Sequence, residues 1–77
     1  MELKIDKEVD ACGLKCPLPI LRAKKALAEL QSGQVLRILA TDASTVQDFQ
    51  AFTKQTGNVL LAFSQHDDIF SFLIKRR

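Results

Sequence analysis

The chain has 77 residues, 47% of them hydrophobic, and a formal net charge of +2. A chain of this length buries one small core and leaves no room for a second core or a large enclosed cofactor pocket. We therefore expect residues 1–77 to form a single domain without a cofactor. Five Phe residues with no Trp or Tyr, and the low net charge, argue against direct nucleic-acid binding.

The sequence predicts no association with a membrane. Its longest apolar run is far shorter than the roughly 18 residues of a membrane-spanning helix, and residues 1–4 show no signal-peptide core. The two cysteines, Cys12 and Cys16, are too few for the disulfide framework of a small secreted protein. These features favour a cytoplasmic protein in which the cysteines have a chemical or a packing role.

The first two predicted elements are a strand and a helix. Residues 3–9 alternate between apolar and polar side chains, which is typical of a half-buried strand, although Lys7 interrupts the apolar row. Across residues 17–31 apolar residues recur at helical spacing, and Gly33 provides a stop signal. The inward stripe of this helix consists of Ile20, Ala23, Leu27 and Leu30.

The next two predicted elements are again a strand and a helix. Residues 34–41 are mainly apolar with a single charge, Arg37, so this strand is expected to lie inside the sheet. Asp42 is a candidate N-cap for a helix that continues to residue 56 and stops at Gly57. The inward-facing residues of this helix are expected to be Val46, Phe49, Phe52 and Thr53.

The last part of the chain predicts a closing hairpin. Residues 58–64 and 69–75 are rich in β-forming residues, and the polar residues 65–68 connect them. The complete order is β-α-β-α-β-β, in which the first helix is a crossover between parallel strands and the last two strands are antiparallel. This order predicts an α/β fold: a two-layer α/β sandwich with a four-stranded mixed sheet and two helices on one face.

The loop between the first strand and the first helix contains the most unusual residues. Pro17 is favourable at a helix start and places Cys16 at the N-cap. A thiolate there faces the free N–H groups of the first turn and the positive end of the helix dipole, so we expect a lowered pKa for Cys16. Pro19 removes another N–H, which leaves the Leu18 N–H as the nearest local donor to the sulfur. The pattern favours an exposed, nucleophilic thiol over a buried N-cap cysteine.

The other candidate residues carry weaker signals. Cys12 is either a second, resolving thiol or simply a packed side chain. A zinc site would have at most Cys12, Cys16 and His66 as ligands, so no metal is expected. His66 lies in a polar turn and is therefore expected to be a surface residue rather than a general base.

A group of basic residues accompanies this loop in the sequence. These residues either steer an acidic partner protein toward the loop or form an ordinary solvated face. The group consists of Lys15, Arg22, Lys24 and Lys25.

The segment Asp10-x-x-Gly13-Leu14-x-Cys16-Pro17-x-Pro19 resembles the TusA/SirA family of small sulfur-carrier proteins. The likeness extends over nearly the whole chain. It implies a fold like that of the C-terminal domain of the third bacterial translation initiation factor, and a sulfane sulfur held as a persulfide on Cys16. It also implies a set of residues that shape the site around this cysteine: Asp10, Gly13, Leu14, Pro17 and Pro19.

The resemblance implies partners as well. A sulfur donor such as a cysteine desulfurase or a rhodanese would load Cys16, and an acceptor protein would receive the sulfur, as in tRNA thiolation or related sulfur metabolism. Such a protein is a sulfurtransferase-type carrier rather than a stand-alone turnover enzyme. Many family members have a further cysteine in the second helix, where this chain has Phe52-Thr53, so the resemblance implies no redox role for that helix.

Two other functions are compatible with the sequence. An RNA-binding or regulatory module would use the basic residues of the first helix and the tail Lys75-Arg76-Arg77. A thiol redox partner would form a reversible disulfide between Cys12 and Cys16, which requires their Cα atoms to lie within about 7 Å. The sulfur relay is the leading hypothesis, because a persulfide at a helix N-terminus is an anionic nucleophile in an electropositive site.

Overall fold

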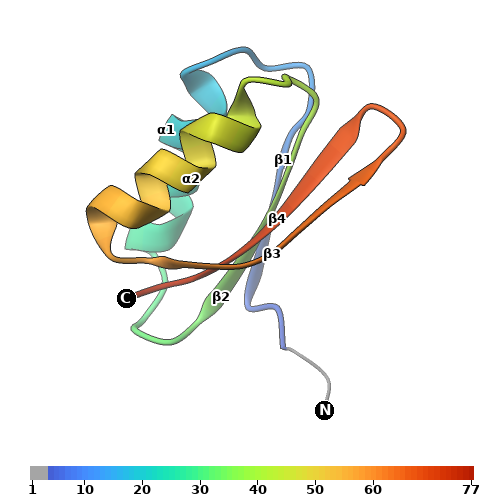
Figure 1. The fold of residues 1–77 in the computed structure, drawn as a ribbon. Coiled ribbons are helices and arrows are strands. Elements are labelled where there is room, and N and C mark those ends of the chain that lie inside the picture. Colours follow the sequence, from blue (N-terminus) through green and yellow to red (C-terminus); the bar gives the residue numbers. More distant parts are fainter. Residues whose placement is uncertain (1–3) are drawn as a thin grey trace.

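One mixed sheet of four strands carries two helices on one of its faces (Figure 1). The structure, a computed structural model, describes residues 4–77. In chain order the elements are β1 (Lys7–Ala11), α1 (Leu18–Ala28), β2 (Val35–Ala40), α2 (Thr45–Thr56), β3 (Val59–His66) and β4 (Ile69–Lys75).

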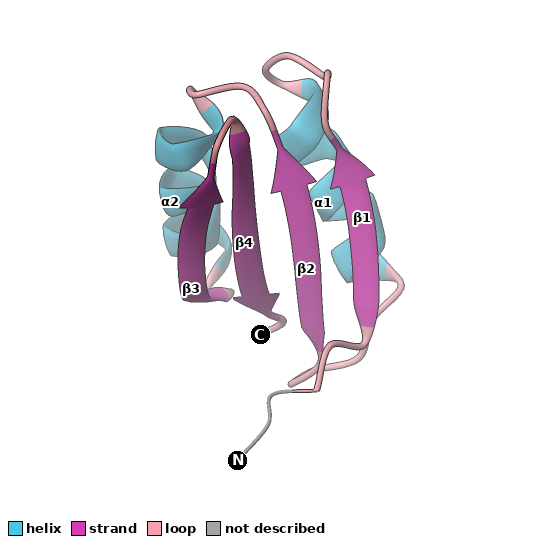
Figure 2. Ribbon diagram, turned by 90° about the vertical axis from the view of Figure 1, so that its right-hand side faces the viewer, coloured by secondary structure: helices cyan, strands magenta, loops and turns pink. Residues whose placement is uncertain are grey.

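The strands lie in the order β1-β2-β4-β3. β1 and β2 are parallel and end side by side, with Ala11 opposite Ala40, while β4 is antiparallel to both β2 and β3. Figure 2 shows both helices behind the sheet when the other face is turned to the viewer. The predicted fold class, the element order and the interior position of the second strand are therefore confirmed.

The core fills the space between the sheet and the two helices. Phe49 of α2 and Phe72 of β4 are fully buried, and their ring centroids lie 4.6 Å apart. α1 contributes smaller side chains, Ala23 and Ala26, and these let the helix approach the sheet closely. Apolar residues that recur at helical spacing thus form the inner face of each helix, as the sequence pattern predicts.

The first strand lies later in the chain than predicted. Residues 3–9 were expected in the strand, whereas β1 spans Lys7–Ala11, and Leu3 lies outside the described residues. The parallel pairing decides this shift, because β2 offers partners as far as Ala40. Lys7, which interrupts the apolar row, is accommodated in β1 because its amino group donates to the Glu29 carboxylate just beyond α1.

The helix boundaries also differ from the prediction. α1 ends at Ala28, although residues up to 31 show helical spacing, and Leu30 is still buried after the helix has ended. The predicted N-cap role of Asp42 is wrong, because α2 begins at Thr45 with Ser44 as the N-cap residue. Gly57 does end α2 in the left-handed conformation, with φ of +81°, and its N–H donates to the Thr53 carbonyl oxygen at 3.0 Å.

The closing hairpin is longer than predicted. β3 continues to His66, and only Asp67 and Asp68 form the turn. Asp67 has φ of +54°, a left-handed conformation that suits a two-residue hairpin loop. Neither helix within residues 4–77 has the length and apolar character that crossing a bilayer requires.

Candidate functional site

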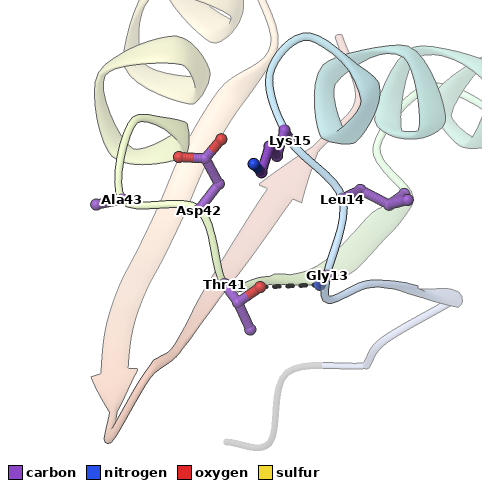
Figure 3. Close-up of a pocket in the computed structure, with 6 residues that line it drawn as sticks. All are labelled: Gly13, Leu14, Lys15, Thr41, Asp42 and Ala43. Atoms are coloured by element: carbon purple, nitrogen blue, oxygen red, sulfur yellow. Dashed lines mark hydrogen bonds between the residues drawn. The ribbon is translucent and has the colours of Figure 1, made fainter.

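The loop between β1 and α1 lies against the loop between β2 and α2. Since β1 and β2 are parallel neighbours, the two loops leave the sheet at the same edge. Two hydrogen bonds join them: the Gly13 N–H donates to Thr41 Oγ1 at 2.8 Å, and the Cys16 N–H donates to Asp42 Oδ2 at 2.9 Å. Figure 3 shows the first of these bonds. The backbone of Cys16 is therefore held in place by Asp42, which the parallel pairing of β1 and β2 brings next to it.

Local turns shape the first of these loops. Asp10 Oδ1 accepts a hydrogen bond from the Cys12 N–H at 2.9 Å, which lowers the pKa of the Asp10 carboxyl. The Leu14 N–H donates to the Ala11 carbonyl oxygen at 3.2 Å, and Gly13 adopts φ of +82° between them. Asp10 and Gly13, both predicted to shape the site, thus form the turn that leads toward Cys16.

An open hollow of about 340 Å³ lies between the two loops (Figure 3). The Lys15 amino group points toward the Asp42 side of this hollow. Hydrogen bonds from the Cys16 N–H and from Ser44 lower the pKa of Asp42, and the charge of Lys15 acts in the same direction. The hollow is lined by Gly13, Leu14, Lys15, Thr41, Asp42 and Ala43.

Cys16 is exposed, as predicted, but it is not the N-cap of α1. Pro17 is the N-cap residue, and its carbonyl oxygen accepts the first helical hydrogen bond from the Leu21 N–H at 3.1 Å. The prediction that the Leu18 N–H would serve the sulfur is also wrong, because this N–H donates to the Lys15 carbonyl oxygen at 2.8 Å. The thiol therefore lies one residue before the cap.

The pKa of the Cys16 thiol is raised, whereas the sequence predicted a lowered value. The first cause is the interaction of the thiol with the neighbouring Asp48 carboxylate, followed by partial desolvation and by the negative charges of Asp48 and Asp42. The Ser44 side chain acts in the opposite direction. Carboxylates of the second helix region, Asp48 first, therefore determine the direction of the shift.

Asp48 belongs to this site, although it was not predicted as a site residue. It lies in the first turn of α2, and its Oδ2 atom is buried without a hydrogen-bond partner among residues 4–77. Thr41 and Ser44 were likewise not predicted as site residues. All three residues follow β2, which is parallel to β1. Because segments that follow neighbouring parallel strands meet at one edge of the sheet, the predicted parallel pairing could have indicated them.

Cys12 differs from Cys16 in its surroundings. It is half-buried, and a hydrogen bond to the Asp10 carboxylate raises the pKa of its thiol, with burial acting in the same direction. Both cysteines are free thiols. The structure thus presents Cys16 to solvent more openly than Cys12.

The remaining residues predicted to shape the site occupy different environments. Pro19 is buried in the first turn of α1, and Leu14 packs partly against the core. Pro17 is exposed beside Cys16. Leu14 and Pro19 therefore anchor the loop to the core, while Cys16 and Pro17 are exposed to solvent.

The four basic residues that were predicted as one group do not form one. Arg22 and Lys25 line a hollow together with the exposed side chains of Leu18 and Leu21. Lys15 lies in the loop before the helix. Lys24 instead lies on another side of α1, where it lines a second hollow with Arg76 and Arg77.

His66 lies at the end of β3 with its side chain 95% exposed, which confirms the predicted surface position. Its Nε2 atom is 3.8 Å from Asp67 Oδ2. Within residues 4–77 no three His, Cys, Asp or Glu side chains gather in a way that could hold a metal ion.

The turn at Gly13 allows a direct test of the loop geometry. Replacing Gly13 by Ala forces a residue with a Cβ into φ of +82°, which is expected to cost about 1 kcal/mol of unfolding free energy. Gly33→Ala is the matched control, because Gly33 has φ of +87° and equally open surroundings. Urea unfolding should show similar losses for both variants, and only Gly13→Ala should also change the alkylation rate of Cys16. Equal alkylation rates in both variants would contradict a positioning role of this turn.

The fold and this loop define a small α/β protein with an exposed cysteine in a loop at one edge of its sheet. A family model described as "Sulfurtransferase TusA" matches residues 7–76. The chain therefore belongs to the TusA family, and it is a sulfur carrier protein.

Individual relatives agree with this assignment. The chain is 58% identical over 71 residues to the sulfur carrier protein TusA of Allochromatium vinosum, covering 92% of this chain and 93% of the relative. It is 46% identical over 74 residues to a Bacillus subtilis protein that is provisionally named a sulfur carrier, covering 96% and 99% of the two chains. Among solved structures, the SirA-like protein of Desulfitobacterium hafniense matches with a TM-score of 0.80 and 32% identity, covering 90% and 95%.

Proposed function

We propose that Cys16 is the residue that carries the sulfur, as a persulfide. The observation that supports this most directly is the exposed thiol of Cys16, whose backbone N–H is held by Asp42 while its side chain remains accessible. Cys12 is a weaker candidate, since it is half-buried whereas Cys16 is exposed. Exposure and a fixed backbone together suit a cysteine that must enter the site of another protein.

Loading would proceed by attack of sulfur on sulfur. The Cys16 thiol loses its proton, and the resulting thiolate attacks the terminal sulfur of a persulfide on the donor protein. The S–S bond in the donor breaks, a new S–S bond forms on Cys16, and the donor cysteine leaves as a thiolate that takes up a proton. Delivery repeats this exchange, with an acceptor nucleophile attacking the terminal sulfur on Cys16. No external oxidant or reductant is needed, because one persulfide replaces another.

The surface beside Cys16 supports docking of other proteins. Leu18 and Leu21 expose apolar side chains immediately after the thiol, and Arg22 and Lys25 add positive charge to the same hollow. An apolar centre with charged neighbours is typical of protein interfaces. We propose that a cysteine desulfurase or a rhodanese docks here as donor and an acceptor protein later takes its place, each contributing acidic residues. The reducing cytoplasm is the compartment that suits a free thiol carrier.

Intact-mass measurement tests the proposed carrier residue. After incubation with a cysteine desulfurase and free cysteine, the chain should gain about 32 Da, the mass of one sulfur atom, and lose it on treatment with a thiol reductant. Cys16→Ser should gain nothing, whereas Cys12→Ser, the matched control, should load like the natural chain. Loading that survives in Cys16→Ser and disappears in Cys12→Ser would assign the sulfur to Cys12 and contradict the proposal.

A further inference from the structure

The β3–β4 hairpin exposes a second apolar surface, away from Cys16. Residues 61–69 are all exposed, and Figure 1 shows this end of the hairpin extending beyond the cover of the helices. Phe63 is opposite the buried Phe72 and Val59 is opposite the exposed Lys75, so the apolar side chains flank the hairpin on both of its faces. The exposed large hydrophobic residues of the hairpin, with the exposed fraction of each, are Val59 (50%), Leu61 (40%), Phe63 (45%) and Ile69 (41%).

β3 is also an edge strand without protecting charges. It pairs with β4 alone, and Figure 2 shows no further strand beside its outer edge. Between Val59 and His66 the sequence has no Lys, Arg, Asp or Glu. Edge strands usually carry such charges, because unpaired backbone N–H and C=O groups otherwise pair with another strand. The register shift between Leu60 and Ala62 lies near the start of β3 and leaves the rest of the strand regular.

The charges at the two ends of β3 are opposite. The turn after β3 consists of Asp67 and Asp68, both exposed. Arg77 lies at the start of β3: its backbone N–H donates to Asn58 Oδ1 at 2.8 Å, and its side chain covers Gly57. When two copies of such a strand pair in antiparallel orientation, the acidic end of each copy faces the basic end of the other. The charges therefore favour a second copy of this chain over an unrelated strand.

We propose that β3 pairs with β3 of a second copy, so that the two sheets join into one across a two-fold axis. Leu61 and Phe63 of the two copies come close together near the axis, and Asp67 and Asp68 of each copy meet Arg76 and Arg77 of the other. β1 and β2, over which α1 packs, lie toward the other edge of the sheet from β3. Cys16 lies in the loop between β1 and α1, so both Cys16 thiols remain accessible in the dimer. This homodimer does not depend on which cysteine carries the sulfur.

Sedimentation equilibrium of the full chain tests the dimer. The natural chain is expected to show a reversible equilibrium between monomer and dimer, with dissociation favoured by high salt because the charge pairs lie at the rim of the interface. A chain that remains monomeric from micromolar to millimolar concentration at low salt overturns the proposal.

Substitution of one leucine locates the interface. Leu61→Lys places a charge on the edge strand and should weaken dimerisation by roughly tenfold or more. Leu21→Lys is the matched control, because Leu21 is similarly exposed but lies on α1 beside Cys16, and it should dimerise like the natural chain. Equal weakening by both substitutions, or by neither, overturns the assignment to β3.

A charge exchange tests the pairing of the two ends, and it keeps the proposal testable if Leu61→Lys fails to fold. The double variant Asp67→Lys with Asp68→Lys has two basic ends, and Arg76→Glu with Arg77→Glu has two acidic ends. Each variant alone should be monomeric, and a mixture of the two should form a heterodimer. Absence of the heterodimer, or dimerisation of either variant alone as strong as that of the natural chain, contradicts the proposed orientation.

Discussion

Alkylation of Cys16 is expected to increase with pH through a midpoint above that of an ordinary exposed thiol, and Asp48→Asn is expected to move this midpoint to lower pH. The thiolate is the reactive form, and it predominates only above the pKa of the thiol. The Asp48 carboxylate raises this pKa because it interacts with the neutral thiol and because its negative charge disfavours the thiolate. Removing that charge favours the thiolate, so the variant should react faster at any pH below the midpoint. Iodoacetamide rates measured between pH 6 and pH 11 in a Cys12→Ser background check this.

Asp67→Asn is the control for this experiment. It also removes one carboxylate, but from the exposed turn of the hairpin, so the midpoint should stay where it is in the natural chain. An unchanged midpoint in Asp48→Asn, or a higher one, contradicts the assigned cause of the raised pKa. A shift of equal size in both variants would instead indicate a general effect of net charge.

The raised pKa has a consequence for a sulfur carrier. Near neutral pH the empty Cys16 is mainly a neutral thiol, so it reacts slowly with small electrophiles in solution. If Cys16 carries the sulfur, as proposed, transfer requires a partner protein that accepts the proton or changes the surroundings of Asp48 when it docks. The same carboxylates would then protect the thiol outside the complex.

Phe49→Ala is expected to cause the largest loss of stability, on the order of 3–5 kcal/mol. The Phe49 side chain is fully buried and contacts both Phe52 and Phe72, so its removal leaves a cavity between α2 and the sheet. Small proteins have a total unfolding free energy of about 5–15 kcal/mol, and a chain of this length is expected near the lower end. Urea unfolding followed by circular dichroism should therefore show a marginally folded variant.

Phe63→Ala is the matched control for this substitution. Phe63 lies on the exposed hairpin, and although its ring contacts Phe70 and Phe72, nearly half of its surface remains in water. The loss should be clearly smaller than for Phe49→Ala, because less apolar area is removed from the core and no closed cavity forms. Similar losses at the two positions would contradict the location of the core.

Local patterns in the sequence determined the element order and the fold class. Alternating and helical spacings of apolar residues follow from the geometry of strands and helices themselves, so a strand such as Ile69–Lys75 was predicted with its correct bounds. Gly57 marked the end of α2 for a similar reason, since a left-handed C-cap favours glycine. The cysteine motif likewise indicated an exposed Cys16, and this prediction needed only the residues on either side of it.

The tertiary structure alone decided the chemistry around that cysteine. The helix dipole and the prolines predicted a lowered pKa for Cys16, but Asp42 and Asp48, some 26 to 32 positions later in the chain, lie beside it and raise the pKa. Sequence spacing cannot show this contact, because it arises from the parallel pairing of β1 with β2, which brings two distant loops to one edge of the sheet. Electrostatic interactions depend on distance in space, and the fold sets that distance.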